Sequence, residues 1–489
     1  MSKRLRISLL CGLVLFAFSG IGLFGHRSNS RKALQQYKAQ LRAQGEKLTY
    51  AELTASRIHS PNNSLAIITN TANQLRRYWF QPGTMDFMPF DKPGRVRIAW
   101  KEAQPRASTS SPGGPVTWVE LTEQVDAAKV ELETIQRELQ DPPRDMGLRT
   151  NIYDGPAPFV AMRNDAQWLA GSTLVELHRA NLEGALKNLE ALIALAQMNG
   201  DEPTLVGQMI RVAIAGLGSA VTWQALQADG WSEAQLKRLQ KRWEQVDLLA
   251  GLETGFTGER TGGQDFFETL RQSNNSRVRG MLGTRPAARS AANLLEDYIV
   301  MPAYRLTSVD DDQLLHLKNM QQAVESVRSL RNHRPWNEVK AKHDKNFASL
   351  QQISGPFQRY RYLFSLLAIP NFERALQTCI RNETQRQMTL AATALKRYQL
   401  HHGKPAASLE ALVPEFLSSV PWDYLGGQPL HYRLNTDGTF ILYSVGEDGQ
   451  DNNGDPNPPQ APKAPDLWSG RDAVWPQPAQ AESTDTVEP

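Results

Sequence analysis

The residues from 158 to 247 constrain the fold of this chain most, because their apolar side chains recur at the spacing of a buried helix face. Residues 205–226 are apolar on almost every side, which predicts a helix buried in the core. Ser232 and Gln235 form a capping-box pattern for a further helix. Short helices joined by tight turns predict antiparallel helical hairpins, so the chain is expected to be mainly α. The apolar positions of the first two predicted helices are Trp168, Leu169, Leu174, Leu177, Ala180, Ala185, Leu189, Leu192, Ile193 and Ala196.

An almost unbroken apolar run of 19 residues lies near the N-terminus, from Ile7 to Gly25. With a rise of about 1.5 Å per residue, a helix of this length crosses a hydrocarbon core of about 30 Å. Residues 1–6 are basic and contain no acid, so the positive-inside rule predicts that they stay in the cytoplasm. We expect residues 7–25 to be a single-pass signal anchor in the lipid bilayer of a bacterial-type inner membrane, with the rest of the chain periplasmic. The alternative is secretion after signal-peptide cleavage, for which Ala17-Phe18-Ser19 offers a weak site.

The exported part divides into four predicted segments. Residues 26–118 comprise a juxtamembrane helix over 30–57 and then a Pro-rich irregular segment, in which the prolines prevent helices longer than about two turns. Residues 96–100 in that segment alternate as a strand does. Residues 119–375 form the predicted α-helical body, whose first helix covers 119–139. Residues 376–475 form a C-terminal module, and residues 476–489 are a disordered tail rich in Pro, Gln, Ala and acidic residues.

The charged residues exclude some classes of function and leave others open. The 54 basic and 51 acidic side chains nearly balance, which gives no reason to expect a nucleic-acid partner. Glu259-Arg260, with Asp265 and Glu268 nearby, is predicted to be a buried ion pair or a solvated helix face rather than a catalytic site. Asp310-Asp311-Asp312 is predicted to begin a helix, because three consecutive carboxylates cannot all face one metal ion.

The C-terminal module has the pattern of a helix packed on a small antiparallel sheet. A helix is predicted to run to about His401, and Gly403 ends it in the manner of a C-cap glycine. Residues 429–434 and 439–445 alternate as two strands, and Asn435-Thr-Asp437-Gly438 supplies the hairpin turn between them. The module is therefore predicted to be α+β.

The return strand leads into a loop, residues 446–455, in which carboxylates and amides alternate with glycines. Calcium prefers several oxygen ligands on a backbone that can fold tightly around the ion. Asp451-x-Asn453-x-Asp455 begins like an EF-hand loop, but Pro456 and Pro462 stand where that loop needs Gly and Glu, so it is not an EF-hand. From composition alone, a solvated Asp/Gly turn fits these residues at least as well as a calcium site.

Several motifs of the module resemble the C-terminal domain of type II secretion major pseudopilins. They are Pro421-Trp-Asp423, Gly427-Gln-Pro429-Leu-His-Tyr432, Leu442-Tyr443-Ser444-Val-Gly446-Glu-Asp448-Gly449 and Arg471-Asp472-Ala-Val-Trp475. That family binds calcium in this loop through aspartates and backbone carbonyls. The resemblance therefore implies a calcium site formed by Asp448, Asp451, Asp455 and Asp472, with Ser444 nearby.

Other parts of the chain depart from that family. Pseudopilins begin with a short leader and a Gly-Phe-Thr-Leu-Ile-Glu-type peptidase site, whereas no acidic residue precedes Glu46 in this chain. About 350 residues separate the predicted anchor from the module, where pseudopilins have one continuous helix. The chain is therefore not expected to be a pilus subunit, and the module is expected to serve as a calcium-stabilised cap on an envelope protein.

No motif in the sequence assigns a catalytic activity. The chain contains no Gly-x-Ser-x-Gly elbow and no P-loop, and His401 and His402 share no metal-ligand spacing with the other histidines. Cys11 and Cys379 are predicted to lie on opposite sides of the membrane boundary, which excludes a disulfide. The leading prediction is a non-enzymatic envelope protein that binds protein partners. The alternative is an exported hydrolase with its active site between the helical body and the C-terminal module.

Overall fold

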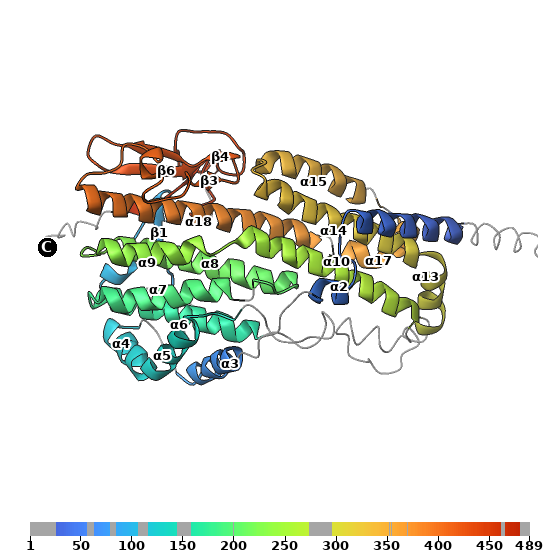
Figure 1. The fold of residues 1–489 in the computed structure, drawn as a ribbon, viewed down its shortest axis with the longest axis horizontal. Coiled ribbons are helices and arrows are strands. Elements are labelled where there is room, and N and C mark those ends of the chain that lie inside the picture. The colour runs from blue at the N-terminus through green and yellow to red at the C-terminus, as the bar shows by residue number, and fades with distance from the viewer. Residues whose placement is uncertain are drawn as a thin grey trace, which may run out of the picture.

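The structure is a computed structural model that describes residues 26–55, 63–78, 85–105, 116–143, 158–198, 200–272, 296–351, 353, 355–368, 370–460 and 465–479. The predicted anchor at 7–25 and Cys11 lie outside the described residues. Within them, Cys379 is buried and free of any disulfide. The fold is mainly helical, with small sheets formed largely by C-terminal strands (Figure 1). The prediction of a mainly α chain with antiparallel strands near its C-terminus is therefore confirmed.

The elements follow one another in this order. A helix over residues 26–43 is followed by α2 (Tyr50–Thr54), α3 (Ser64–Leu75), β1 (Phe90–Lys92), β2 (Arg95–Val96), the 3-10 turn η2 (Ala99–Lys101), α4 (Trp118–Ala127), α5 (Lys129–Glu138), α6 (Phe159–His178), α7 (Leu182–Gln197), α8 (Leu205–Leu226), α9 (Glu233–Glu244) and α10 (Leu248–Gln272). Then come the π-helical turn η3 (Glu296–Val300), α13 (Met301–Thr307), α14 (Val309–Arg331), α15 (Trp336–Gln351), α16 (Pro356–Arg361), α17 (Leu363–Ala368), α18 (Pro370–His402) and η4 (Glu410–Leu412). The C-terminal strands are β3 (Trp422–Asp423), β4 (Gln428–Pro429), β5 (His431–Leu434), β6 (Phe440–Ser444), β7 (Ala473–Val474) and β8 (Gln477–Pro478).

Helix α8 forms the centre of the bundle and has the bounds that its apolar pattern predicts. It packs against α6, α7, α10 and α18, and Val221, Trp223 and Ala225 are fully buried. Among the described residues, α8 is the one helix long and apolar enough to cross a membrane, and most of it is buried inside the protein. Its apolar surface therefore serves as the core that the other helices cover.

The helices on either side of α8 form the predicted hairpins. Asn181 caps α7 by accepting a hydrogen bond from the Gly184 N–H (3.1 Å). Ser232 caps α9 in a full capping box with Gln235, as predicted. The predicted helix over 119–139 is instead two helices, because the chain bends at Ala128. The bend lets α4 contact α6 while α5 contacts α3 and α7.

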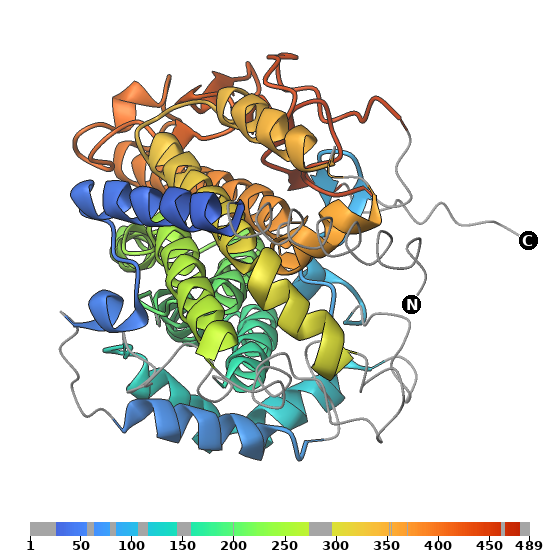
Figure 2. The ribbon, with the colours of Figure 1, turned by 90° about the vertical axis from the view of Figure 1, so that its right-hand side faces the viewer.

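The N-terminal segment differs from the single helix predicted over 30–57. The helix ends at residue 43, and Gly45 takes a left-handed conformation (φ +80°) in the turn that precedes α2. Leu34, Leu41 and Leu48 are each 1% exposed, so both parts bury apolar side chains. The helix over residues 26–43 lies across α10 and α14 (Figure 2), and is therefore packed onto the body.

Residues 60–118 contain more regular structure than their prolines suggest. Helix α3 is 12 residues long, exceeding the predicted limit of about two turns, because its residues fall between prolines and pack on α5 and α6. The strand predicted over residues 96–100 is confined to β2, and residues 99–101 form η2. The Ala99 N–H donates to the side-chain oxygen of Gln224 on α8 (2.9 Å), which holds this turn against the core.

The C-terminal module has the predicted helix and hairpin. Gly403 ends α18 with φ +67°, and β5 pairs antiparallel with β6, with His431 opposite Tyr443. β7 adds a third strand to β6, and the sheet lies alongside α18 (Figure 1). The apolar core extends across the predicted body and the C-terminal module. One continuous apolar core includes Ile68, Leu169, Leu442 and Trp475.

The chain beyond Trp475 also departs from its prediction. Residues 476–479, which the sequence assigned to a disordered tail, are ordered, and β8 pairs parallel with β2. The Trp223 indole on α8 donates to the Pro476 carbonyl (2.8 Å). The partner of β8 lies some 380 residues earlier in the chain, so local composition carries no signal for this contact. Residues 480–489 lie outside the described residues.

Candidate functional site

The structure places the predicted calcium loop beside β6 and β7. The buried Asp472 carboxylate accepts hydrogen bonds from the backbone N–H groups of Asn452 (3.2 Å), Gly454 (2.7 Å) and Asp455 (3.1 Å). The Asp472 N–H in turn donates to the Asp455 carbonyl (3.0 Å). Asp472 therefore closes the loop through backbone contacts.

The other predicted ligands each have their own partners. Asp455 pairs with Arg471 (2.9 Å). Asp451 accepts from the Tyr443 hydroxyl (3.0 Å), and Asp448 accepts from the Gln450 N–H (3.0 Å). Among the described residues, the one group of three metal-ligand side chains with donor atoms within 4.8 Å of one another lies elsewhere, at the end of α18.

Ser444, predicted to lie near the calcium, contacts a different carboxylate. Its hydroxyl donates to Asp423 (2.8 Å), which also accepts from the backbone N–H groups of Leu425 (2.9 Å) and Val445 (3.0 Å). Burial raises the pKa of Asp423, while these hydrogen bonds oppose the rise. Asp423 lay within one of the motifs that resemble pseudopilins, yet nothing in its local sequence indicated that it would organise the strand ends.

A cleft of about 730 Å³, the first cleft, lies on the opposite side of the helical body, between the α4–α5 pair and helices α7 and α9. Its walls carry a surplus of positive charge. The basic lining residues are Lys129, Arg137, Arg179, Lys187, Arg238 and Arg242, and the acidic ones are Asp126, Glu133, Glu176 and Glu190. The lining residues come from helices that are separate in the chain, so no local sequence pattern indicated this cleft.

The acidic side chains of the first cleft are already paired. Asp126 binds Arg179 (2.6 Å) and Glu190 binds Arg238 (2.6 Å). The side-chain amide of Gln136 donates to Asn188 (2.7 Å) across the cleft wall. By contrast, neither Lys187 nor Arg242 has a carboxylate within 4.0 Å among the described residues. These two cations are therefore available to an acidic ligand.

A buried hydroxyl also lines the first cleft. Ser172 on α6 is 1% exposed, and its Oγ has no hydrogen-bond partner in the described part of the chain. A buried hydroxyl without a partner carries a desolvation cost. The cleft thus combines unpaired charge at its walls with an unsatisfied polar group.

A second cleft of about 520 Å³ adjoins the first, with Gln140 and Arg242 lining both. Arg211 on α8 lines the second cleft and is 4% exposed. It donates to the Ala196 carbonyl (2.8 Å) and to Gln208 (2.5 Å), but no described carboxylate lies within ion-pair distance. Burial lowers the pKa of Arg211 to about 10. Because Asp201 and Asp247 also line this cleft, its charge is mixed.

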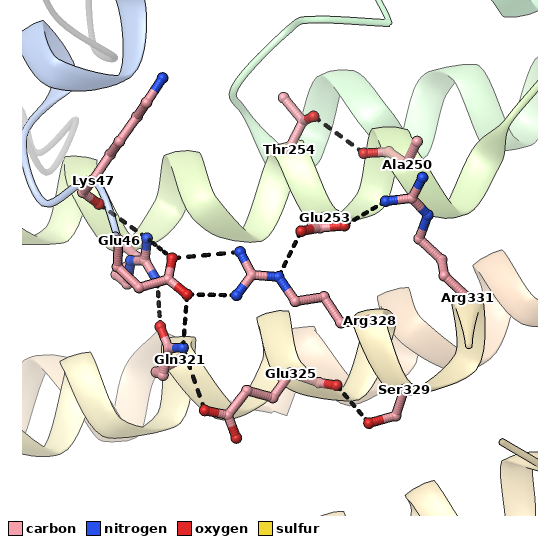
Figure 3. A network of polar contacts seen from close by, with 11 residues as sticks. Glu46, Lys47, Ala250, Glu253, Thr254, Gln321, Glu325, Arg328, Ser329 and Arg331 are labelled. Carbon is pink, nitrogen blue, oxygen red and sulfur yellow. Dashed lines mark hydrogen bonds and ion pairs between the residues drawn. The ribbon is translucent and has the colours of Figure 1, made fainter. Parts of the chain in front are cut away.

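A third polar feature joins the N-terminal segment to the body (Figure 3). Arg260, fully buried on α10, donates to Glu46 (2.9 Å), to the Lys47 carbonyl (2.9 Å) and to Gln321. Arg328 on α14 also binds Glu46. The predicted buried ion pair at Arg260 is confirmed, but its partner is Glu46 rather than a neighbour in sequence. This network fills an interface and lines neither cleft.

The carboxyl groups best suited to general acid catalysis lie outside the clefts. Burial raises the pKa of Asp165, Glu259, Asp265, Asp312 and Asp423. None of them lines the first or second cleft. Asp312 stands in the predicted acidic start of α14, but it is fully buried and accepts from Tyr304 (2.6 Å), so it organises the α14–α17 contact.

Comparison with protein-family models, with curated proteins and with solved structures finds no match to this chain.

Proposed function

We propose that this protein is a non-enzymatic, membrane-anchored component of a bacterial-type cell envelope, which binds an extended acidic polypeptide segment in its first cleft. The unpaired cations of the cleft carry this proposal. Lys187 and Arg242 have no carboxylate partner among the described residues, while the acidic side chains around them are satisfied. Complementary charge steers such a partner to the cleft and fixes its register.

The shape of the cleft supports a polypeptide as the partner. The first and second clefts adjoin at Gln140 and Arg242, so an extended chain can occupy both. Side-chain amides among the lining residues offer hydrogen bonds to a peptide backbone. The alternative of a hydrolase between body and module receives no support from either cleft, since both lie elsewhere.

Peptide binding tests the proposal directly. Full-length protein in detergent would be titrated into two labelled peptides of equal length, one rich in Glu and one with Lys in place of each Glu. We expect binding of the acidic peptide that weakens with salt. Lys187→Glu or Arg242→Glu should each reduce its affinity by about 10-fold, equivalent to about 1.4 kcal/mol. Lys237→Glu, on the exposed side of α9, is the matched control and should leave the affinity unchanged. Equal binding of the two peptides, or an equal effect of the control, would refute this function.

The membrane location rests on the apolar run at residues 7–25. We expect the protein to remain with the membrane after alkaline carbonate extraction. A variant with Leu13→Arg and Leu15→Arg should be released, because charge at the bilayer centre opposes insertion. A C-terminal alkaline phosphatase fusion should be active if the bulk of the chain is exported. Release of the unmodified protein as a shorter chain would instead indicate signal-peptide cleavage and secretion.

The calcium-stabilised loop belongs to the same proposal and has a separate test. It rests on the Asp/Gly-rich loop that follows β6, in which the Asp472 carboxylate holds the backbone N–H groups of Gly454 and Asp455. We expect millimolar calcium to raise the melting temperature of the full-length protein, and Asp451→Asn to reduce that shift. Magnesium is the control cation. An unchanged melting temperature in calcium would remove the calcium site and leave the cleft proposal untouched.

A further inference from the structure

The last turn of α18 presents two adjacent imidazoles, His401 and His402, to solvent. Gly403 ends the helix in a left-handed conformation, and its N–H donates to the Gln399 carbonyl (2.9 Å). The last carbonyl groups of a helix lack intrahelical donors, so this end carries partial negative charge that favours a cation. The two ring centroids lie 4.8 Å apart.

The chain returns to the same point 12 residues later and adds a carboxylate. The Oε1 atom of Glu415 lies 3.7 Å from the Nε2 atom of His401. The next residue, Phe416, is buried and contacts both imidazole rings with centroid distances of 5.9 Å. Its carbonyl accepts a hydrogen bond from the Gln240 side chain (2.6 Å). The backbone beside Glu415 is therefore anchored to the core, while its carboxylate stays in solvent.

The donor atoms of these three side chains lie within 4.8 Å of one another. In a tetrahedral zinc site, with metal–ligand bonds of about 2.0–2.2 Å, two donor atoms stand about 3.4 Å apart. The His401–Glu415 pair already approaches that separation, and rotation of exposed side chains can close the remaining distance. We propose that His401, His402 and Glu415 form a surface binding site for a divalent transition metal of the zinc class, with solvent in the remaining position.

The donor set separates this site from the predicted calcium loop. Two imidazole nitrogens and one carboxylate suit Zn²⁺, Ni²⁺ or Cu²⁺, whereas Ca²⁺ and Mg²⁺ prefer all-oxygen ligands. In the sequence, the two histidines have no metal-ligand spacing. The turn between Gly403 and Phe416 supplies the third ligand, which no spacing rule for a single helix could reveal.

The test is zinc binding by untagged full-length protein, measured by isothermal titration calorimetry in a buffer that does not chelate zinc. We expect one zinc per chain at this site, unaffected by excess calcium or magnesium. Replacing a residue that hydrogen-bonds to a metal ligand weakens metal affinity by about 10- to 100-fold, and removing a ligand should weaken it at least as much. His401→Ala, His402→Ala and Glu415→Gln should therefore each weaken binding at least to that extent. All three side chains are exposed, so circular dichroism is expected to show an intact fold.

His26→Ala is a matched control. His26 is a half-buried histidine beside a carboxylate, 3.0 Å from Asp311, but it has no second imidazole within reach among the described residues. This variant should bind zinc as the parent does. Visible absorption of the cobalt-loaded protein provides a second readout, which should be lost with His401→Ala. Zinc affinity that survives the three substitutions, or falls equally in His26→Ala, would overturn the proposal.

Discussion

Replacing Glu46 by Gln should strongly destabilise the protein, because this carboxylate is the counter-ion of a fully buried arginine. Arg260 is 0% exposed, and Glu46 is its one carboxylate partner within 4.0 Å among the described residues. Its Nε atom has no hydrogen-bond partner in the described part of the chain, so the guanidinium has no alternative contact to strengthen. Glu46→Gln keeps the size of the side chain and removes only the charge.

The size of the effect can be worked out in two ways. Burial raises the pKa of Glu46, but hydrogen bonds from Arg328 and Gln321 and the charge of Arg260 outweigh it and lower the pKa from 4.5 to about 2. That change corresponds to about 3 kcal/mol of stability at neutral pH. Breaking a buried ion pair on one side typically costs about 3–5 kcal/mol. We therefore expect Glu46→Gln to lower the free energy of unfolding by about 3–5 kcal/mol.

The pH dependence gives the same prediction a second signature. Since the pKa of Glu46 is lower in the folded state, the contribution of this carboxylate to the free energy of unfolding is fully present above pH 4.5 and is lost as the pH falls toward 2. Urea unfolding of the full-length protein in detergent, followed across this pH range, should show the loss for the wild type. The Glu46→Gln curve should lack this component.

Glu253→Gln is the matched control for this experiment. Glu253 binds Arg328 (2.7 Å) and Arg331 (2.7 Å), but these arginine side chains are 41% and 43% exposed. Loss of such solvated pairs should cost about 1 kcal/mol or less. If Glu46→Gln stayed within about 0.5 kcal/mol of the wild type, or if the control cost as much, the assignment of Glu46 as a buried counter-ion would be wrong.

Three further predictions concern other polar and close-packed sites. Burial lowers the pKa of His316 to about 4, so the folded state disfavours protonation of this side chain. The free energy of unfolding should therefore decrease as the pH falls from 6.5 to 4. Urea unfolding of His316→Leu should lack this decrease. A Cβ atom at Gly263 would lie 1.9 Å from His316 Nε2, so Gly263→Ala should lower the free energy of unfolding by about 1–3 kcal/mol in a thermal-melting assay. Gly216→Ala is the control: its Cβ would meet only the end of the Asn382 side chain, so it should not destabilise the protein. Asp472→Asn leaves at least one backbone N–H of the 452–455 loop without an acceptor, so it should lower the free energy of unfolding by about 1–3 kcal/mol and speed amide exchange in this loop. Asp448→Asn, at an exposed position, is the control. Equal exchange in the two variants would contradict the role of Asp472.

Local sequence signals predicted the elements whose stabilising contacts are also local. The all-round apolar pattern located α8 with its observed bounds, and the capping box at Ser232 located the start of α9. The left-handed Gly403 and the hairpin turn at 435–438 likewise appear where the residue types favour them. In each case the decisive interaction lies within a few residues of the signal.

The errors arose where distant segments decide the structure. The tail was predicted to be disordered from its composition, but Gln477 pairs with Gly94 and Ala479 with Val96 through main-chain hydrogen bonds. The acidic residues considered for Arg260 were its neighbours in the sequence, but its partner is Glu46, 214 residues away. Both clefts and the His401–His402–Glu415 group also need the tertiary fold, since their residues come from different helices or turns.

The charges that bind the N-terminal segment also determine the direction in which it docks. Lys38 pairs with Glu268, and Glu46 pairs with Arg260. The two residues of the N-terminal segment and the two residues of α10 are each eight positions apart, so the segments run antiparallel at this contact. In the opposite direction Lys38 would face Arg260 and Glu46 would face Glu268, which places like charges together at an interface with little solvent. An apolar contact alone would not discriminate between these directions. Because the predicted anchor at residues 7–25 immediately precedes this segment, the same ion pairs would set which end of the helical body faces the membrane.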